Sequence, residues 1–248
     1  MSSRISLLVP LLVSALLLGC SRPLYIQDRK HTVYEVNNAQ TADSAMANFL
    51  SPYKAGVDTL MKVAIGRTDI PLSKAQPESL LGNFVADAQL AAAKKTDSRV
   101  VASVVNYGGI RLSYIPPGPI TRRTLYELMP FENLITIVEV PGAVIKQFCD
   151  HMAKAKGWPV SGISYTFKDQ KAFDIMIGGA PVNDHILYKV AVSDYLANGG
   201  DHCDFLTDLN KKPTAILVRD ALIDYVALTE KQNKPLHPTI ENRVLYAE

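Results

Sequence analysis

The chain has 248 residues, of which 48% are hydrophobic and 20% charged, and its net charge at pH 7 is +2. This near-neutral balance includes no basic stripe of the kind that nucleic-acid binding requires, so we expect no nucleic-acid partner. After the first twenty residues no second long apolar segment occurs, so nothing else in the sequence is expected to span a membrane.

The N-terminal residues predict a secretory signal. Arg4 precedes an apolar run over residues 5–18, and the sequence Leu-Leu-Gly-Cys closes this region at Cys20. This lipobox-like ending predicts that residues 1–19 are a lipoprotein signal peptide and that lipidated Cys20 anchors the protein to a membrane of the bacterial cell envelope, facing the periplasm or the exterior. Two alternatives stay open: an ordinary signal peptide with an incidental cysteine, or an uncleaved anchor, although a membrane span needs about 20 apolar residues.

Residues 20–56 are interpreted as a tether and N-terminal segment, with a weak helical pattern from Ser44 to Leu50. Residues 57–248 are expected to form the folded domain, and a first strand is predicted from Met61 to Gly66. The mature length suffices for one sizeable core or for two small lobes that share one.

Helices and strands alternate through the rest of the chain. A helix is predicted from Glu78 because apolar residues recur at helical spacing, and Thr124 to Glu127 has the spacing of a capping box for a short helix. The mixture favours an α/β domain of mixed α+β type with helices outside the sheets. Strands are predicted at Arg99–Asn106, Leu134–Val140, Ile163–Phe167, Phe173–Ile177, Leu187–Ser193 and Arg243–Tyr246, a hairpin connection at Lys168–Ala172, and further helices after Pro141-Gly142 and near Arg219–Leu228.

Two glycine-containing or aromatic loops follow predicted elements in the first half of the domain. In the first loop, Asn106, Gly108 and Gly109 would let a ligand approach the backbone, and Arg111 offers a fork of donors. A tight turn with a surface arginine is an equally good interpretation. In the second loop, an exposed Phe131 would be a stacking platform and Asn133 a reader of a ring edge, or they would plug the core and cap the turn.

Two more loops lie in the second half. Val160 to Tyr165, which contains Gly162, is by itself the start of a strand. Tyr195 leaves a predicted strand and precedes the turn Gly-Gly-Asp, which ends at Asp201. This pair would place a ring and a carboxylate beside one ligand, or Asp201 would only bond its own turn.

Several catalytic patterns are missing from the sequence. We find no Asp-x-His, Gly-Asn-His or His-x-His ligand pattern, no Gly-x-Ser-x-Gly elbow, and no Rossmann or Walker loop. Accordingly we expect no metal and no other cofactor to bind to this chain. Besides Cys20, only Cys149 and Cys203 are present, and they would either form a disulfide or be buried separately.

Four segments in this order resemble the C-terminal domain of the 5′-nucleotidase and UDP-sugar hydrolase family. Leu81–Ala88 resembles the Leu-Gly-Asn-hydrophobic-Asp-Ala helix that opens that domain, and Asn106–Arg111 is similar to its Asn-Gly-Gly-Ile-Arg loop. Gly118–Asn133 resembles the Gly-x-Ile-Thr…Leu-x-Pro-Phe-x-Asn stretch, and Tyr195–Asp201 the aromatic-x-x-x-Gly-Gly-Asp motif. The resemblance runs from about Val63 to the C-terminus.

The resemblance implies a layered α-β-β-α fold that recognises the base and sugar of a nucleotide. Phe131 and Tyr195 would sandwich the base, and Asn133 would contact its edge. Asp201 would bind the ribose hydroxyls, and Arg111 would reach toward the sugar or phosphate. In the same way, the glycine at position 162 would lie beside the base, where a side chain would intrude.

The chain also departs from the family. Lys74-Ala75-Gln76 stands where some members carry arginines, and we recognise no part of the family's metallophosphoesterase domain, which holds two metal ions. We therefore expect a nucleoside- or nucleotide-binding lipoprotein that completes an active site with a separate metallophosphoesterase, where the divalent metals would lie. The alternatives are an autonomous nucleoside-binding lipoprotein, an enzyme that uses Arg111, Asp201 and His202, or a structural domain without a ligand.

Overall fold

The computed structural model describes residues 31–35, 37, 41 and 43–248. The predicted signal peptide and Cys20 lie outside these residues. The chain divides into two compact units, Met1–Phe49 and Leu50–Glu248, and the sheets and the site described below belong to the second. Among the described residues no helix is both long enough and apolar enough to cross a membrane.

The first described helix is longer than its sequence pattern predicts. Helix α2 spans Ser44–Met61, against the expected Ser44 to Leu50, and none of its residues is buried. Because the helix continues to Met61, the strand predicted from Met61 to Gly66 begins later, as β1 (Ala64–Thr68).

The largest sheet has five strands in the order β12-β6-β11-β3-β7. Strand β11 runs parallel to β3, whereas β6 is antiparallel to both β11 and β12, and β7 is antiparallel to β3. The three middle strands confirm three predicted ones. Strand β7 lies in the segment from Val160 to Tyr165, which the sequence indicates as the start of one strand, and β12 was not predicted. The five strands are β3 (Val100–Val104), β6 (Leu134–Pro141), β7 (Val160–Ser161), β11 (Leu187–Ser193) and β12 (Lys211–Leu217).

A second sheet has four strands in the order β10-β9-β8-β13. The predicted hairpin between β8 and β9 is confirmed, and its turn residues Asp169 and Gln170 have φ of 47° and 65°. The C-terminal strand β13 pairs in parallel with β8. The strands are β8 (Ile163–Lys168), β9 (Lys171–Ile177), β10 (Ala180–Pro181) and β13 (Val244–Tyr246).

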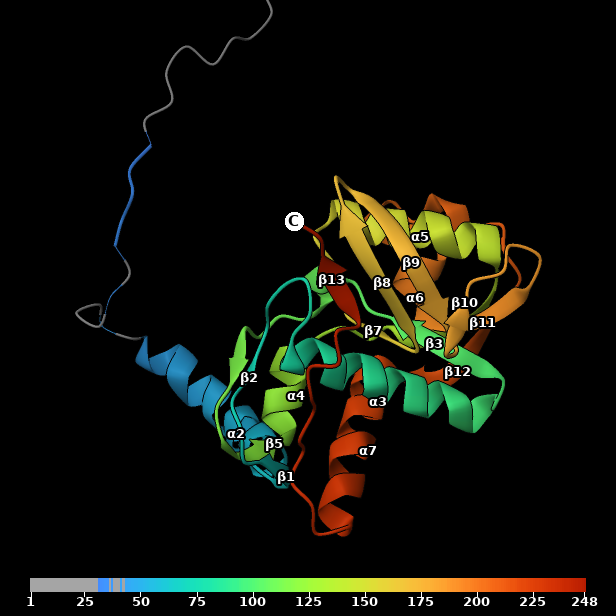
Figure 1. The fold of residues 1–248 in the computed structure, drawn as a ribbon. Coiled ribbons are helices and arrows are strands. Elements are labelled where there is room, and N and C mark those ends of the chain that lie inside the picture. The colour runs from blue at the N-terminus through green and yellow to red at the C-terminus, as the bar shows by residue number, and fades with distance from the viewer. Residues whose placement is uncertain (1–30, 36, 38–40, 42) are drawn as a thin grey trace, which may run out of the picture. The chain divides into compact units, whose positions relative to one another are not determined.

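Two short ladders complete the strands: β1 pairs with β5, and β2 with β4. Figure 1 shows α3 and α7 below the four-stranded sheet, with α5 beside β8 and β9. The remaining elements are β2 (Leu72–Ser73), β4 (Tyr114–Ile115), β5 (Gly118–Thr121), α3 (Leu80–Thr96), α4 (Arg122–Leu128), α5 (Gly142–Lys154), α6 (Asp194–Ala197), α7 (Val218–Lys231) and the 3-10 turns Tyr107–Gly109, Gly200–His202 and Asp204–Leu206.

The start of helix α4 differs from its prediction. The spacing from Thr124 to Glu127 predicts a capping box there, but the N-cap is Thr121. The Thr121 hydroxyl accepts the Thr124 amide at 3.2 Å, and Thr124 reaches back to the Thr121 amide. The capping box therefore has a threonine at the third helical position, where glutamate is more common. For this reason the usual sequence pattern does not detect it.

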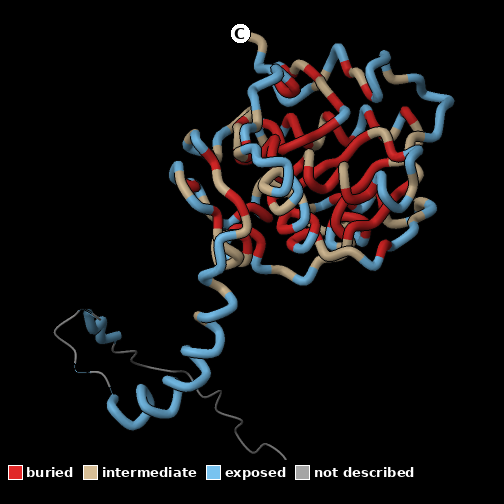
Figure 2. Tube along the Cα trace, turned by 90° about the horizontal axis from the view of Figure 1, so that it is seen from below, coloured by how far each residue is buried: buried red, intermediate tan, exposed pale blue. Residues whose placement is uncertain are grey.

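The five-stranded sheet separates two hydrophobic cores. Because side chains alternate along a strand, Ile135 and Ile137 of β6 face one core, and Val138 and Val140 face the other. The first core packs the sheet against α3, α4 and α7, and the second packs it against α5 and the four-stranded sheet. Figure 2 shows these buried residues gathered inside the second unit. The mixed α/β fold class is thus confirmed.

Both cysteines of the described domain are buried and free, so the predicted alternative of separate burial holds. Burial raises the pKa of both thiols, to about 12 for Cys203. These side chains therefore behave as small apolar groups of the second core rather than as nucleophiles.

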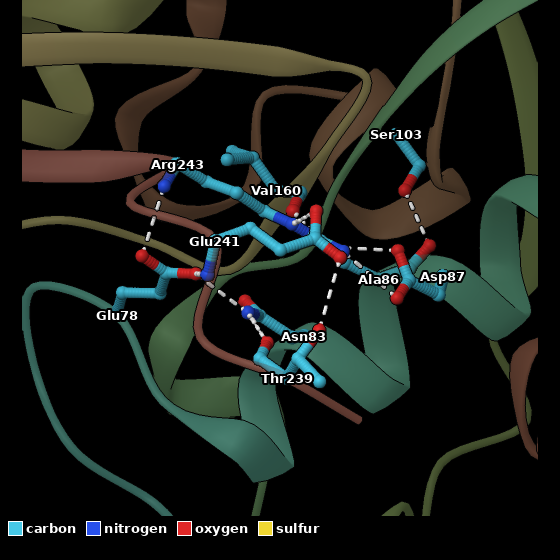
Figure 3. Close-up of polar contacts among 9 residues, drawn as sticks. All are labelled: Glu78, Asn83, Ala86, Asp87, Ser103, Val160, Thr239, Glu241 and Arg243. Atoms are coloured by element: carbon cyan, nitrogen blue, oxygen red, sulfur yellow. Dashed lines mark hydrogen bonds and ion pairs between the residues drawn. The ribbon is translucent and has the colours of Figure 1, made fainter. Parts of the chain in front are cut away.

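A polar network fastens the segment before β13 to helix α3 (Figure 3). Arg243 donates two hydrogen bonds to the Asp87 carboxylate, at 2.8 and 2.9 Å, and a third to the Val160 carbonyl at 2.9 Å. The Glu78 carboxylate accepts the amides of Glu241 and Arg243 at 2.9 and 2.8 Å. These bonds hold the last strand in register beside β8.

Candidate functional site

A cavity of about 300 Å³ opens at one edge of the five-stranded sheet. Eight of the nine binding residues that the sequence predicts line this cavity, although the loops that carry them lie far apart in the chain. The exception is Gly162. The lining residues are Gln89, Val105, Asn106, Gly108, Gly109, Arg111, Met129, Phe131, Asn133, Ser193, Tyr195, Asp201 and Val218.

Strand directions explain why these loops meet. Strands β3 and β11 run parallel, so their carboxyl ends lie at the same edge of the sheet. Strand β6 is antiparallel to β11, and its Ile135 pairs with Ser193, so β6 begins at the edge where β11 ends. The loop after β3, the loop before β6 and the turn after β11 therefore surround one space. Such an edge is where α/β sheets commonly bind ligands.

Tyr195 and Asp201 are locked to each other on one side of the cavity. The Tyr195 hydroxyl donates to Asp201 Oδ1 at 2.7 Å and accepts the Asp201 amide at 3.1 Å. Asn106 Nδ2 donates to the other carboxylate oxygen at 2.7 Å. A Cβ on Gly200 would lie 2.5 Å from Tyr195 Cε1, so this glycine allows the ring to pack on the turn.

This arrangement leaves Tyr195 available to a ligand while its orientation is held. The residue is 45% exposed, and its hydrogen bond to Asp201 raises the pKa of the hydroxyl. Asp201 has φ of 49°, in the left-handed region that aspartate tolerates better than most residues. A carboxylate offers about four acceptor positions, so Asp201 can still accept hydrogen bonds from two ligand hydroxyls.

Phe131 is half-buried on another part of the cavity wall. The Arg111 guanidinium carbon lies 4.9 Å from the centroid of its ring, within the range of a cation–π contact. Behind the loop, buried Arg219 stacks on Tyr126 at 4.1 Å and points Nη1 at the Phe131 carbonyl. Phe131 is therefore supported from its backbone side while its ring borders the cavity.

A second cation, which the sequence motifs did not single out as a binding residue, lies close to Arg111. Lys74 Nζ donates to the Ile110 carbonyl at 2.8 Å and lies 3.9 Å from the centroid of the Tyr107 ring. Burial, and next the charge of Arg111, lower the pKa of Lys74. Among the described residues neither Lys74 nor Arg111 forms an ion pair with a carboxylate. Two such neighbouring cations favour an anionic ligand group.

Comparison with known proteins identifies the family. Residues 60–208, more than half of the chain, match the family described as 5′-nucleotidase, C-terminal domain. The chain belongs to the 5′-nucleotidase C-terminal domain family. The match includes the loops that carry Arg111, Phe131 and Asp201.

Curated relatives of this 5′-nucleotidase C-terminal domain are longer than the chain. It is 27% identical over 219 residues to the trifunctional nucleotide phosphoesterase protein YfkN of Bacillus subtilis, covering 79% of this chain and 14% of that protein. The 5′-nucleotidase of Vibrio cholerae is 28% identical over 179 residues, covering 67% and 31%. The fold resembles a 5′-nucleotidase precursor from Thermus thermophilus with a TM-score of 0.71 at 24% identity, covering 83% of this chain and 44% of that one.

Gly162 of the 5′-nucleotidase C-terminal domain does not line the main cavity, so the structure does not bring it together with the other eight predicted binding residues. It borders a separate hollow together with Glu241 and Arg243. Its φ is +72°, and an added Cβ would lie 2.1 Å from the Val101 carbonyl oxygen. Glycine is thus required there because two backbone segments approach each other closely. In a sequence, such a glycine cannot be distinguished from one that lets the backbone approach a ligand.

Replacing Gly162 with alanine is therefore expected to destabilise the domain without changing ligand affinity per folded molecule. Left-handed strain alone costs about 1–2 kcal/mol, and the overlap with Val101 adds to it. Gly179→Ala is the matched control, since its φ is +84° and its added Cβ meets nothing within 4 Å. Chemical denaturation should rank Gly162→Ala well below Gly179→Ala. Equal stabilities, or a selective loss of ligand affinity in Gly162→Ala, would contradict this assignment.

Proposed function

We propose that this domain recognises 5′-nucleotides through the cavity bordered by Phe131 and Tyr195. The base lies between the two rings and Asn133 contacts its edge, while Asp201 accepts hydrogen bonds from the ribose hydroxyls. The observation that carries this proposal is the meeting of both aromatic side chains and these polar groups around one cavity. A planar apolar ligand with a polar edge and a vicinal diol matches that combination of groups.

The cations favour a nucleotide over a nucleoside. Lys74 and Arg111 lie near each other, and within the described part of the chain neither has a carboxylate partner. A phosphate at the cavity mouth would neutralise both. Lys74 would lose its contacts with the carbonyl and the ring when it binds the phosphate, which partly offsets the gain in binding free energy. The expected net contribution of the phosphate is therefore that of about one charge-assisted hydrogen bond.

We further propose that a separate metallophosphoesterase supplies the hydrolytic step. The sequence carries none of the metal-ligand patterns that such chemistry uses, and the relatives named as a trifunctional nucleotide phosphoesterase and a 5′-nucleotidase are several times longer than the matched segment. The base pocket and the metals must act on one substrate, so the two proteins would dock around the nucleotide. Attachment to the cell envelope through Cys20 would bring the domain to substrates outside the cytoplasm, and this attachment stays a prediction.

The experiment that tests this proposal is calorimetric titration of the purified protein, starting at Ser21, with AMP, adenosine and ribose 5-phosphate. We expect AMP to bind about tenfold more tightly than adenosine, because one charge-assisted hydrogen bond contributes roughly 1.5 kcal/mol at a partly exposed site. Raising the salt concentration should reduce this difference. Ribose 5-phosphate should bind weakly, since it has no base for the rings.

Each outcome separates the candidate functions. Equal binding of AMP and adenosine would favour an autonomous nucleoside-binding protein over a partner of a phosphoesterase. Release of phosphate from AMP by this protein alone, unaffected by a chelator, would contradict the assignment of hydrolysis to a partner. Failure of AMP and adenosine to bind would contradict the proposed recognition role itself.

A further inference from the structure

Gln89 on helix α3 lines the cavity and is almost wholly buried, with 1% of its surface exposed. Its amide nitrogen donates hydrogen bonds to the carbonyls of Val104 and Ala191, both at 3.1 Å. Val104 is the last residue of β3, and Ala191 lies two residues before the end of β11, at the edge of the sheet that borders the cavity. Both amide hydrogens are therefore used, and they fix the orientation of the side chain. The reverse orientation would set the Gln89 oxygen against two carbonyl oxygens.

The carbonyl oxygen of Gln89 is left without a partner. Among the described residues none donates a hydrogen bond to Oε1. The oxygen nevertheless keeps some accessible surface, because it is not among the fully inaccessible side-chain atoms of the fold that lack a hydrogen-bond partner. Since only 1% of the residue is exposed and the residue lines the cavity, the small accessible surface of Oε1 opens into that cavity. The cavity wall thus presents a fixed hydrogen-bond acceptor.

Other polar groups at the cavity are partly occupied by the protein. The Ser193 hydroxyl accepts the Leu196 amide, and both oxygens of Asp201 accept bonds from Tyr195 and Asn106. Gln89 Oε1 has no donor among the described residues, and the amide nitrogen beside it is bonded to two backbone carbonyls. Because the side chain is fixed in this way, the oxygen cannot turn away from a ligand. A buried acceptor of this kind favours a ligand that brings a donor and disfavours one that brings a second lone pair.

We propose that Gln89 determines which bases the cavity accepts, by accepting a hydrogen bond from an exocyclic amino group. Adenine and cytosine carry such a group where hypoxanthine and uracil carry a carbonyl oxygen, so the amino-bearing nucleotides are preferred. This inference rests on the proposed function, because it places the base in the cavity between Phe131 and Tyr195. It adds a specificity-determining residue that lies on a helix, outside the four loops.

The test compares AMP with purine riboside 5′-monophosphate, which is the same nucleotide without the amino group. The wild-type protein should bind AMP at least about tenfold more tightly, the effect of one hydrogen bond to a fixed buried acceptor. In Gln89→Met, which keeps the length of the side chain but not the acceptor, the two affinities should become equal within about twofold. Because each ratio is measured on a single sample, a partial loss of folded protein does not alter it.

Gln76→Met is the matched control. The Gln76 amide nitrogen also donates to two backbone carbonyls, those of Ala155 and Gly157, but Gln76 does not line the cavity. Its substitution should lower stability in the same way as Gln89→Met and leave the preference for AMP unchanged. If Gln89→Met does not fold, the side-chain amide resonances of Gln89 in the wild-type protein replace it. At saturation they should shift more with AMP than with purine riboside 5′-monophosphate, whose ring lies nearby but offers no amino group.

The outcomes are distinguishable. A wild-type protein that binds both nucleotides equally, a Gln89→Met variant that keeps the preference, or equal resonance shifts with both ligands would overturn the role of Gln89 while leaving nucleotide binding intact. If neither nucleotide binds to the wild-type protein, the proposed function fails and this inference fails with it.

Discussion

Arg243→Met is expected to lower the free energy of unfolding by about 3 kcal/mol, because it leaves a largely buried carboxylate without its partner. The Arg243 and Asp87 side chains are 10% and 26% exposed and share two hydrogen bonds. The substitution also removes the donor that satisfies the Val160 carbonyl. Chemical denaturation monitored by circular dichroism measures this loss.

Arg99→Met provides the control for that experiment. Arg99 forms the same kind of ion pair with Asp97, but its side chain is 74% exposed, and exposed pairs contribute less than about 1 kcal/mol. The two variants lose the same atoms, so the difference between them measures the burial of the Arg243 site together with the bonds of Arg243 to Val160 and Glu241 and the second partner, Lys189, that Asp97 retains. A loss in Arg243→Met no greater than that in Arg99→Met would show that the C-terminal segment is held mainly by its backbone pairing with β8.

Loss of either aromatic ring is expected to weaken AMP binding by about 5- to 150-fold, since stacking on one ring is worth about 1–3 kcal/mol per base. Phe131→Ala and Tyr195→Ala should each show this effect in calorimetric titration. The double variant should show no measurable binding. Both side chains are partly exposed at the cavity, so the stability of the domain should change much less than the affinity does.

Tyr195→Phe distinguishes stacking from hydrogen bonding. It keeps the ring but removes the bond from the hydroxyl to Asp201, so the ring is less firmly held and Asp201 is freer. A loss below about tenfold is expected, in line with one neutral hydrogen bond of about 1 kcal/mol. If Tyr195→Phe weakens AMP binding as much as Tyr195→Ala, the ring does not stack on the base. If neither substitution has an effect, the base lies elsewhere.

Loop chemistry made most of the candidate site predictable from sequence. Glycines, a proline and aromatic residues at the ends of predicted strands indicated the loops of Asn106, Phe131 and Tyr195 as candidate binding segments, each with a structural alternative left open. Periodicity also located the main helices and the middle strands of the large sheet. That the loops meet at one edge was implied only by the family resemblance, because strand order and direction are long-range properties.

The features that were missed depend on distant partners. Gln89 lies in a helix whose sequence gives no sign that its amide reaches carbonyls 15 and 102 residues away. Strand β12 begins with two lysines and contains Pro213, and local sequence patterns associate such residues with loops. An edge strand such as β12 tolerates both. The family resemblance implied a bound base as the reason for glycine at position 162, whereas the neighbour that an added side chain would meet is Val101.

A crystal structure of the protein with AMP would show where the nucleotide lies. The proposed binding mode places the adenine ring between Phe131 and Tyr195, the ribose hydroxyls at Asp201, and the amino group within hydrogen-bond distance of Gln89 Oε1. AMP bound in another hollow of the domain, or bound in this cavity with its base outside the two rings, would contradict it.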